Sequence, residues 1–393
     1  NRGAVYAEGK IVYNLLDGRT VAVDAESGTE LWQTKVAELT KGETITMAPL
    51  VVGDRVMVGA SGGEYGIHGW IKGLDLETGD VVWTGRNMGP DNVVLATPGT
   101  FKSFYDDGDD LALTTWADDT WQRGGAPVWG WLSYDPELDL VYYGTGNPGP
   151  YNAEQRGGDN KWSSSVLARR PSDGELIWAY QFTPNDNWDY DANAENILVE
   201  LEIDGRSRNV LVHFDKNGFA YTLDRATGEL LVAEPFVEVN WAERVDLETG
   251  RPVVDPAKLT GKSRGMVKNI CPNLEGGKSP ASPASYSPQT GLFYVPTNNL
   301  CMDWQSDDAT YIQGTPYVSA NIPYTAGPGG HLGAFIAWDA TTGERVWEIK
   351  EKYPVWSGSV VTAGDVTFYG CLLYTSPSPR DARKYLVCRL LLE

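Results

Sequence analysis

The 393-residue sequence contains only three histidines, His68, His213 and His331, and they are scattered along the chain. No two of them have the spacing of a zinc or other transition-metal site. The sequence also lacks any apolar run near the roughly 18 residues that a membrane helix requires. Basic residues are few, since 32 lysines and arginines stand against 53 acidic residues and the net charge is −21. This charge argues against nucleic acid and anionic lipid as partners, and it favours a cation, a neutral substrate or a basic protein.

Cysteine is scarce as well, with four residues at Cys271, Cys301, Cys371 and Cys388. A bond between Cys271 and Cys301 would close a loop of about 30 residues and stabilise the fold by about 3 to 4 kcal/mol in the chain-entropy model. Such a bond favours an oxidising compartment such as the periplasm, whereas two buried free thiols are the alternative. The first residues show no signal-peptide pattern, which predicts either a removed signal peptide or an incomplete N-terminus.

Glycine and tryptophan are abundant, with 44 and 15 residues, and they recur in one template. Five segments contain a strand, a turn that ends in glycine, and a second strand that reaches Trp or Val four residues later: 21–32, 72–83, 167–178, 221–232 and 336–347. The glycine suits a positive φ, and the closing aromatic can pack between neighbouring sheets. The copies lie about 50 residues apart or at twice that distance, which is typical of one four-stranded blade per copy. The pattern predicts an all-β fold, a β-propeller; a β-sandwich is the alternative, but it does not explain the fixed offset of the tryptophan.

Several longer motifs resemble those of the pyrroloquinoline quinone (PQQ) dependent alcohol dehydrogenases, especially the methanol and ethanol group. They are "SGGEYGIHGW", "VWGWLSYDPELDLVYYGTGNPGPYN", "GGDNKWSSSV", "TPNDNWDYDANAENIL", "FDKNGFAYTLDR", "NICPN" and "NNLCMDW". The resemblance implies an eight-bladed propeller, of which residues 1–370 would supply an incomplete part. Residues 371–393 leave the pattern and resemble a translated sequencing adapter, so we expect a non-native tail; a natural basic tail is the alternative.

Asp189 and Asp191 stand two residues apart, so in an extended segment both side chains would point to one side and could face one ion,. A chain poor in histidine and rich in carboxylates suits a hard, oxygen-ligated cation, although an isolated pair of this kind is more often a solvated loop. The resemblance implies that Glu64 and Asn147 are metal ligands and that Asp189 is the catalytic aspartate that also touches the metal. It further implies that Asp191 is the additional aspartate of the lanthanide-dependent members, with Ca²⁺ as the alternative ion.

The resemblance also implies a site for PQQ, a flat tricarboxylate that needs an aromatic floor, cations and close backbone approach. Trp129 matches the residue on which the quinone stacks, and Lys216 matches a basic residue near the quinone oxygens. The residues that match polar contacts of the cofactor are Arg2, Thr46, Ser61, Gly62 and Gly63. Two departures from the family pattern stand out: Ser279 replaces an asparagine near the active site, and the adjacent cysteine pair that precedes "NRG" in the family is absent.

By this resemblance the chain would oxidise short primary alcohols to aldehydes and pass electrons to a cytochrome c. A homodimer is one alternative for its oligomeric state. The metal would polarise a quinone carbonyl, Asp189 would take the proton of the alcohol hydroxyl, and Lys216 would stabilise the developing oxyanion. A PQQ-dependent sugar or polyol dehydrogenase is the enzymatic alternative. A non-catalytic propeller scaffold is the other, but it has no reason to keep four matching metal ligands together.

Overall fold

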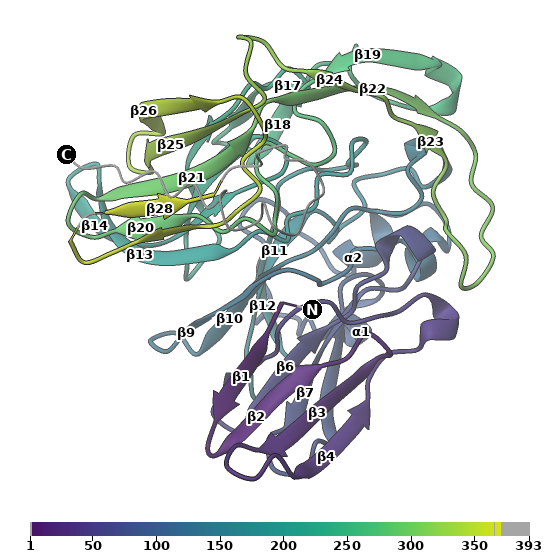
Figure 1. Cartoon of the computed structure of the whole chain (residues 1–393). Helices are drawn as coiled ribbons and strands as arrows, with labels where there is room; N and C mark the ends of the chain where they lie inside the picture. The colour runs from purple at the N-terminus through teal and green to yellow at the C-terminus, as the bar shows by residue number, and fades with distance from the viewer. Residues whose placement is uncertain (1, 365, 371–393) are drawn as a thin grey trace, which may run out of the picture.

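The computed structural model describes residues 2–364 and 366–370, so the expected non-native tail at 371–393 lies outside the described residues. Within them, the strands form six four-stranded sheets and two two-stranded sheets, all paired antiparallel (Figure 1). This is the predicted all-β fold with repeated four-stranded blades.

The first three sheets contain consecutive strands in up-and-down order. They are β1 (Ala4–Ala7), β2 (Lys10–Asn14), β3 (Arg19–Asp24) and β4 (Glu30–Lys35); β5 (Leu50–Val52), β6 (Arg55–Gly59), β7 (Trp70–Asp75) and β8 (Val81–Arg86); and β9 (Leu132–Asp135), β10 (Leu140–Gly144), β11 (Ser165–Arg169) and β12 (Leu176–Gln181). The long connection between β8 and β9 holds the short helices α1 (Asp91–Val94), α2 (Leu111–Thr114) and η3 (Thr120–Arg123).

After the regular sheet β13 to β16 the order changes, because two of the later sheets pair strands that are distant in sequence. The strands are β13 (Asn196–Ile203), β14 (Arg206–Phe214), β15 (Phe219–Asp224) and β16 (Leu230–Pro235); β17 (Ala242–Asp246) and β18 (Arg251–Val254); β19 (Met266–Ile270), β22 (Leu300–Ser306), β23 (Ala320–Asn321) and β24 (Tyr324–Ala326); β20 (Ser285–Ser287), β21 (Leu292–Asn298), β25 (Gly333–Asp339) and β26 (Glu344–Glu351); and β27 (Ser359–Val361) with β28 (Thr367–Tyr369). Single-turn helices are η1 (Leu39–Lys41), η2 (Gly63–Tyr65), η4 (Ala153–Gln155) and η5 (Lys262–Arg264). No helix in the described ranges is long and apolar enough to cross a membrane.

The repeated turn has one hydrogen-bonding scheme. In its first copy, Oδ1 of Asp24 accepts the backbone N–H groups of Glu26 and Ser27 at 3.2 and 2.7 Å, and Gly28 has a φ of +70°. A side chain that bonds its own following backbone stabilises such a turn, and glycine takes the left-handed position without steric cost. The structure contains a sixth copy at 246–250, between β17 and β18, which the sequence analysis missed although Val254 follows its glycine at the offset of the template.

The closing tryptophan of one copy packs on the turn glycine of the next. A Cβ on Gly174, for example, would lie 2.4 Å from the ring of Trp83, while the Trp83 indole N–H donates to the carbonyl of Pro171 at 2.9 Å. Trp32 and Trp178 make the same two contacts with the copies that follow them. The fixed offset between Gly and Trp therefore couples each blade to its neighbour, and the packing predicted for the aromatic is confirmed.

Buried apolar residues lie between the sheets. The first cluster joins β6, β7, β10 and β11 through residues such as Val56, Ile71, Tyr143 and Leu167. The Cys271–Cys301 disulfide predicted as one of two alternatives is present, and it ties the segment after β19 to β22. This bond fixes one end of the loop that follows Cys271. The loop packs on Lys216, because the Gly277 N–H donates to the Lys216 carbonyl at 3.0 Å.

Candidate functional site

Asp189 and Asp191 lie in the irregular segment between β12 and β13, and both face Lys216, which lies in the turn between β14 and β15. The Lys216 Nζ atom is 2.7 Å from Asp191 Oδ2 and 3.2 Å from Asp189 Oδ2. All three side chains are buried. Two carboxylates that are far from Lys216 in sequence therefore share one buried cation.

The sequence predicted an extended segment in which both aspartate side chains point to one side. This prediction of an extended backbone is wrong. Asp189 has a φ of +67°, a left-handed conformation that is uncommon outside glycine and is concentrated at functional sites,. The neighbouring Asp186 stabilises this conformation: its Oδ1 accepts the Trp188 N–H at 2.8 Å and its Oδ2 accepts the Tyr190 N–H at 2.7 Å. Burial raises the pKa of Asp186 to about 6. The sequence analysis missed Asp186, although an aspartate two residues before a backbone donor is typical of such a turn.

Asp191 also contacts two other predicted site residues. Its Oδ1 accepts the backbone N–H of Asn147 at 3.0 Å and the indole N–H of Trp129 at 3.4 Å. Only glycine fits at Gly146, since a Cβ there would lie 2.5 Å from the same oxygen. Asn193, another residue missed in the sequence, accepts the backbone N–H of Trp129 at 3.1 Å. These contacts place the Trp129 ring beside the aspartate pair.

Glu64 belongs to η2, a turn that follows two glycines. Gly62 has a φ of +118°, and a Cβ there would lie 2.1 Å from the carbonyl of Gly42. A Cβ on Gly63 would lie 3.6 Å from Asn147 Oδ1, so the turn carries Glu64 next to Asn147. The Glu64 side chain is solvent-accessible although protein atoms surround it. This crowding, together with the charge of Asp191, raises its pKa.

The predicted cofactor contacts form a connected chain on the other side of Trp129. Arg2 donates to the carbonyl and the hydroxyl of Thr46 at 3.2 and 3.1 Å, and the Thr46 and Ser61 hydroxyl oxygens are 2.6 Å apart. The guanidinium of Arg2 lies 4.8 Å from the centre of the Trp129 ring. A half-buried aromatic face, a guanidinium and the glycine pair of the preceding turn are thus close together, which fits a flat, anionic ligand.

The charge of the site is unbalanced. Glu64, Asp189 and Asp191 supply three carboxylates, and Lys216 is the cation that bonds to two of them, Asp189 and Asp191. Burial is the largest cause that raises the pKa of Asp189, and the neighbouring acids raise it further, while Lys216 opposes them. Among the described residues, no three acidic, histidine or cysteine side chains form a ready metal cage. The surplus of negative charge and the all-oxygen donors nevertheless fit a hard cation.

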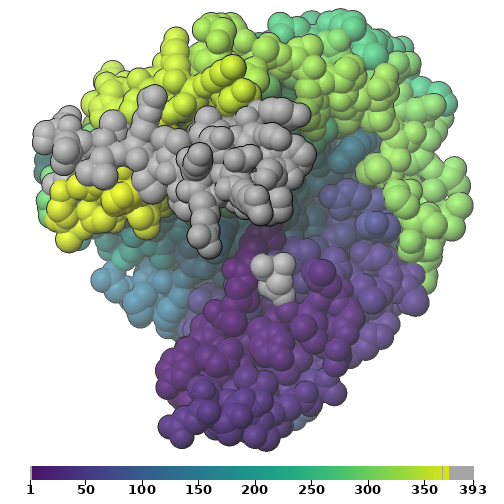
Figure 2. Space-filling view, viewed as in Figure 1, coloured from purple at the N-terminus to yellow at the C-terminus, as the bar shows by residue number. Residues whose placement is uncertain are grey.

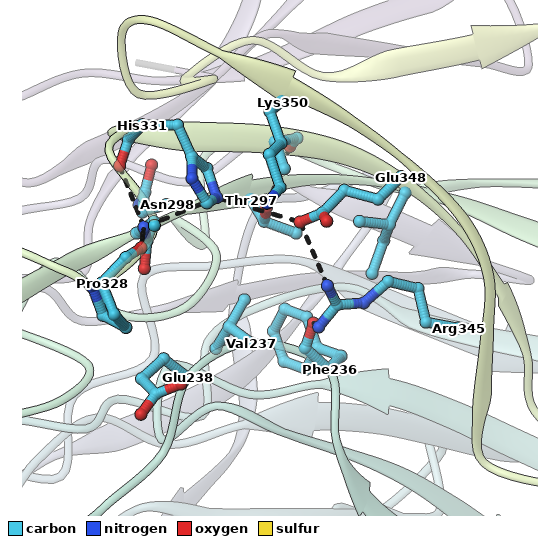
Figure 3. A pocket seen from close by; sticks show the side chains of 14 residues that line it. Phe236, Val237, Glu238, Thr297, Asn298, Pro328, His331, Arg345, Glu348 and Lys350 are labelled. Atoms are coloured by element: carbon cyan, nitrogen blue, oxygen red, sulfur yellow. Dashed lines mark hydrogen bonds and ion pairs between the residues drawn. The ribbon is translucent and has the colours of Figure 1, made fainter.

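A separate pocket of about 220 Å³ lies beside β26 (Figure 3). Glu348 is its central group, with Arg345 at 3.0 Å and His331 at 3.8 Å. None of the residues predicted for the functional site lines this pocket. The Arg345 pair lies within β26, and the His331 contact joins β26 to the loop before β25, so we assign the pocket a structural role.

Residues 11–245 match the family model of the PQQ glucose, ethanol and alcohol dehydrogenase β-propeller domain. The chain is 54% identical over 377 residues to the lanthanide-dependent methanol dehydrogenase of Methylacidiphilum fumariolicum, an alignment that covers 95% of this chain and 61% of that protein. It is 47% identical to the lanthanide-dependent methanol dehydrogenase of Methylorubrum extorquens, covering 95% and 64%. The solved structure of a europium-containing methanol dehydrogenase superposes with a TM-score of 0.92 and 53% identity, covering 94% of this chain and 65% of that one.

The chain therefore spans just under two thirds of the length of these relatives. The family model matches more than half of the chain, and the matched region contains sheets, glycine turns and site motifs described above. The expected family and the propeller fold are confirmed, and the chain belongs to the PQQ-dependent alcohol dehydrogenase family of β-propeller proteins.

Proposed function

We propose that this chain carries the cofactor and metal centre of a PQQ-dependent alcohol dehydrogenase that oxidises short primary alcohols, methanol and ethanol among them, to aldehydes. The observation that carries the proposal is the buried contact of Lys216 with Asp189 and Asp191, beside the half-buried ring of Trp129. A solvated loop or a packing tryptophan needs no such arrangement.

Seven residues would hold PQQ. Trp129 offers an aromatic face for the flat quinone, while Gly62 and Gly63 allow close approach of the backbone. Cationic and hydroxyl groups suit the three carboxylates of the cofactor, and those near Trp129 are Arg2, Thr46, Ser61 and Lys216.

Four residues would hold the metal: Glu64, Asn147, Asp189 and Asp191. Asn147 is neutral, so Glu64 and Asp189 would supply two negative charges, enough for Ca²⁺. Asp191 would supply a third, which suits a trivalent lanthanide and relieves the repulsion among buried acids. We therefore propose a lanthanide as the native ion, in agreement with the names of the two lanthanide-dependent relatives.

When bound, PQQ with its metal supplies the acceptor for the hydride that leaves the alcohol carbon. Asp189 acts on the substrate in its ionised form and accepts the hydroxyl proton at its carboxylate. Lys216 holds Asp189 Oδ2 by a charge-assisted hydrogen bond and stabilises negative charge that develops nearby,. The Asp189 side chain is itself buried, which limits the access of water to the carboxylate.

Electrons would pass to a cytochrome c in the periplasm. Two observations support this part of the proposal: the disulfide suits an oxidising compartment, and the net charge of −21 suits a basic partner,. A relative from Methylorubrum extorquens that is 39% identical is named "methanol dehydrogenase [cytochrome c] subunit 1".

Binding of PQQ to the purified chain tests the proposal directly. Addition of PQQ with La³⁺ should quench the tryptophan fluorescence, and the variant Trp129→Ala should lose most of this quenching, whereas Trp356→Ala, which removes an exposed tryptophan far from the site in sequence, should not. Dye-linked assays with methanol, ethanol, propanol and glucose then separate an alcohol from a sugar dehydrogenase. No PQQ binding with either La³⁺ or Ca²⁺ would contradict the proposal.

A further inference from the structure

A long segment, residues 307–319, leaves the sheet at the end of β22 and returns to it at β23; we call it the strap. Its neck is closed by the Asp307 N–H, which donates to the Ser319 carbonyl at 2.9 Å. Figure 1 shows the strap as the yellow-green loop that descends on the right toward the purple N-terminal sheets, and Figure 2 shows their surfaces side by side there. The strap thus brings together parts of the chain more than 250 residues apart, as its bond to Thr40 confirms.

Both arms of the strap are tethered. On the descending arm, Gln155 and Ala309 exchange two hydrogen bonds at 3.0 and 2.9 Å, and the Asn152 amide donates to Asp308 at 3.1 Å. At the tip, the Gln313 side chain donates to the Thr40 carbonyl at 3.2 Å. These contacts hold the strap against two connections, the one with η4 between β10 and β11 and the one with η1 between β4 and β5.

The returning arm clamps the turn that carries Glu64. The Tyr317 N–H donates to the Glu64 carbonyl at 2.6 Å. The rings of Tyr311 and Tyr317 lie edge to face, 5.4 Å apart, and both press on Gly66, where a Cβ would lie 2.8 Å from Tyr317 and 3.1 Å from Tyr311. Tyr317 is only 6% exposed. The clamp is therefore a packed contact that requires glycine at position 66.

Glu64 benefits from this support because its side chain has little of its own. Its carboxylate has no ion-pair partner in the part of the chain that the structure describes, and glycines precede and follow its turn. Glycine-flanked turns have many accessible backbone conformations, so fixing one of them costs conformational entropy. A contact that fixes the turn during folding reduces the conformational entropy that would otherwise be lost when an ion binds.

We propose that Tyr311 and Tyr317 are positioning residues for Glu64, and that the strap thereby sets the affinity of the metal site. The inference rests on the proposed role of Glu64 as a metal ligand. Supporting contacts behind a metal ligand typically change affinity about 10- to 100-fold when removed, and we expect Tyr317→Ala to weaken binding by about that factor.

Terbium luminescence tests the inference on the whole chain without cofactor or turnover. Tb³⁺ bound in the site would be sensitised by Trp129, so titration gives the dissociation constant. Tyr317→Ala should bind Tb³⁺ about 10- to 100-fold more weakly, whereas Tyr317→Phe, which keeps the ring, should bind like the wild type. Ile312→Ala is the matched control, because Ile312 belongs to the same strap but is 61% exposed.

A double-mutant cycle separates positioning from general loss of structure. In a Glu64→Gln background the effect of Tyr317→Ala should largely disappear; an effect of the same size there would overturn the inference. Gln155→Ala, which loosens the strap without touching the Glu64 turn, should weaken binding less than Tyr317→Ala, and wild-type affinity in both variants would also overturn it. If the wild type itself binds no Tb³⁺, the proposed metal site is contradicted. If Glu64→Gln weakens binding and Tyr317→Ala does not, the metal site stands and only the strap inference is contradicted.

Discussion

Lys216 and Asp191 form a buried ion pair, with 2.7 Å between Lys216 Nζ and Asp191 Oδ2. The other oxygen of Asp191 accepts the Asn147 N–H and the Trp129 indole N–H. Every contact of this carboxylate is therefore with a residue of the candidate site. Removing either partner of a buried pair leaves a charge without compensation, and this gives the first two predictions.

The variant Lys216→Met should lower the free energy of unfolding by about 3 to 5 kcal/mol, because it leaves Asp189 and Asp191 buried without a cation. La³⁺ should restore part of this stability by neutralising the same carboxylates. Lys278→Met is the matched control, since it breaks the buried pair of Lys278 and Glu195 at 2.7 Å away from the proposed ligands. Urea unfolding with and without La³⁺ measures both effects. Equal rescue of the two variants would contradict a metal site at Lys216.

Asp191→Ala should weaken lanthanide binding about 100-fold or more and reduce the preference for La³⁺ over Ca²⁺, because it removes the third negative charge. In assays of alcohol oxidation, La³⁺ should support activity better than Ca²⁺, and this variant should lose that activity while staying folded. Titration with Tb³⁺ in competition with Ca²⁺ gives both affinities. Glu248→Ala, at an exposed acidic residue, is the control for loss of one charge. Unchanged lanthanide affinity in Asp191→Ala would show that Asp191 is no ligand.

Much of the fold could be predicted from the sequence, because its rules are local. A glycine at positive φ defines each turn, and in all but the Gly174 copy, where Arg170 takes its place, an aspartate bonds its own following backbone. The copies at Gly28, Gly79, Gly174, Gly228 and Gly343 were therefore recognisable. The copy at Gly250 was missed although it fits the template, with Val254 in the place that tryptophan takes in four of the five recognised copies. The interlocking of Trp83 with Gly174 could be expected only in outline, since a sequence shows an offset and not the partner across the interface.

The candidate site was predictable in its members and not in its geometry. The groups that meet at Asp191 come from four segments, which hold Trp129, Asn147, the aspartate pair and Lys216. The approach of Asp189 depends on a left-handed backbone that Asp186 stabilises. The alternation of side chains along an extended segment cannot reveal such a conformation. The strap was missed for a related reason: the bond from Tyr317 to Glu64 joins two backbones, and main-chain contacts across 253 residues leave no signal in side-chain patterns.

The contact between Trp83 and Gly174 predicts a graded loss of stability. Gly174→Ala should lower the free energy of unfolding by about 2 to 4 kcal/mol, because it adds steric overlap with Trp83 to the strain of a positive φ,. Gly28→Ala is the matched control: its φ is nearly the same, but nothing lies within 4 Å of the added Cβ. This control should cost about 1 kcal/mol. Urea unfolding measures both, and equal losses would show that the tryptophan contact adds nothing.

His68 predicts how stability depends on pH. It lies between strands β6 and β7, its Nε2 donates to the Met88 carbonyl at 2.7 Å, and its ring packs edge to face on Trp121. Burial, with a smaller contribution from the charge of Arg86, lowers the pKa of His68 to about 4. An unfolded histidine has a pKa of about 6.5. The unfolded state therefore takes up the proton first as pH falls.

The stability that neutral His68 contributes is complete above about pH 6.5 and is lost progressively as pH falls toward about 4, on the order of 1 to 3 kcal/mol in all. His68→Gln keeps a donor for the Met88 carbonyl but cannot titrate, so its free energy of unfolding should fall less over this interval. Asp186, whose raised pKa acts in the opposite direction, is present in both proteins and cancels in the comparison. Urea unfolding at pH 4, 5, 6 and 7 gives the two curves. Parallel curves over the whole interval would show that His68 is protonated as readily in the folded chain as in the unfolded one.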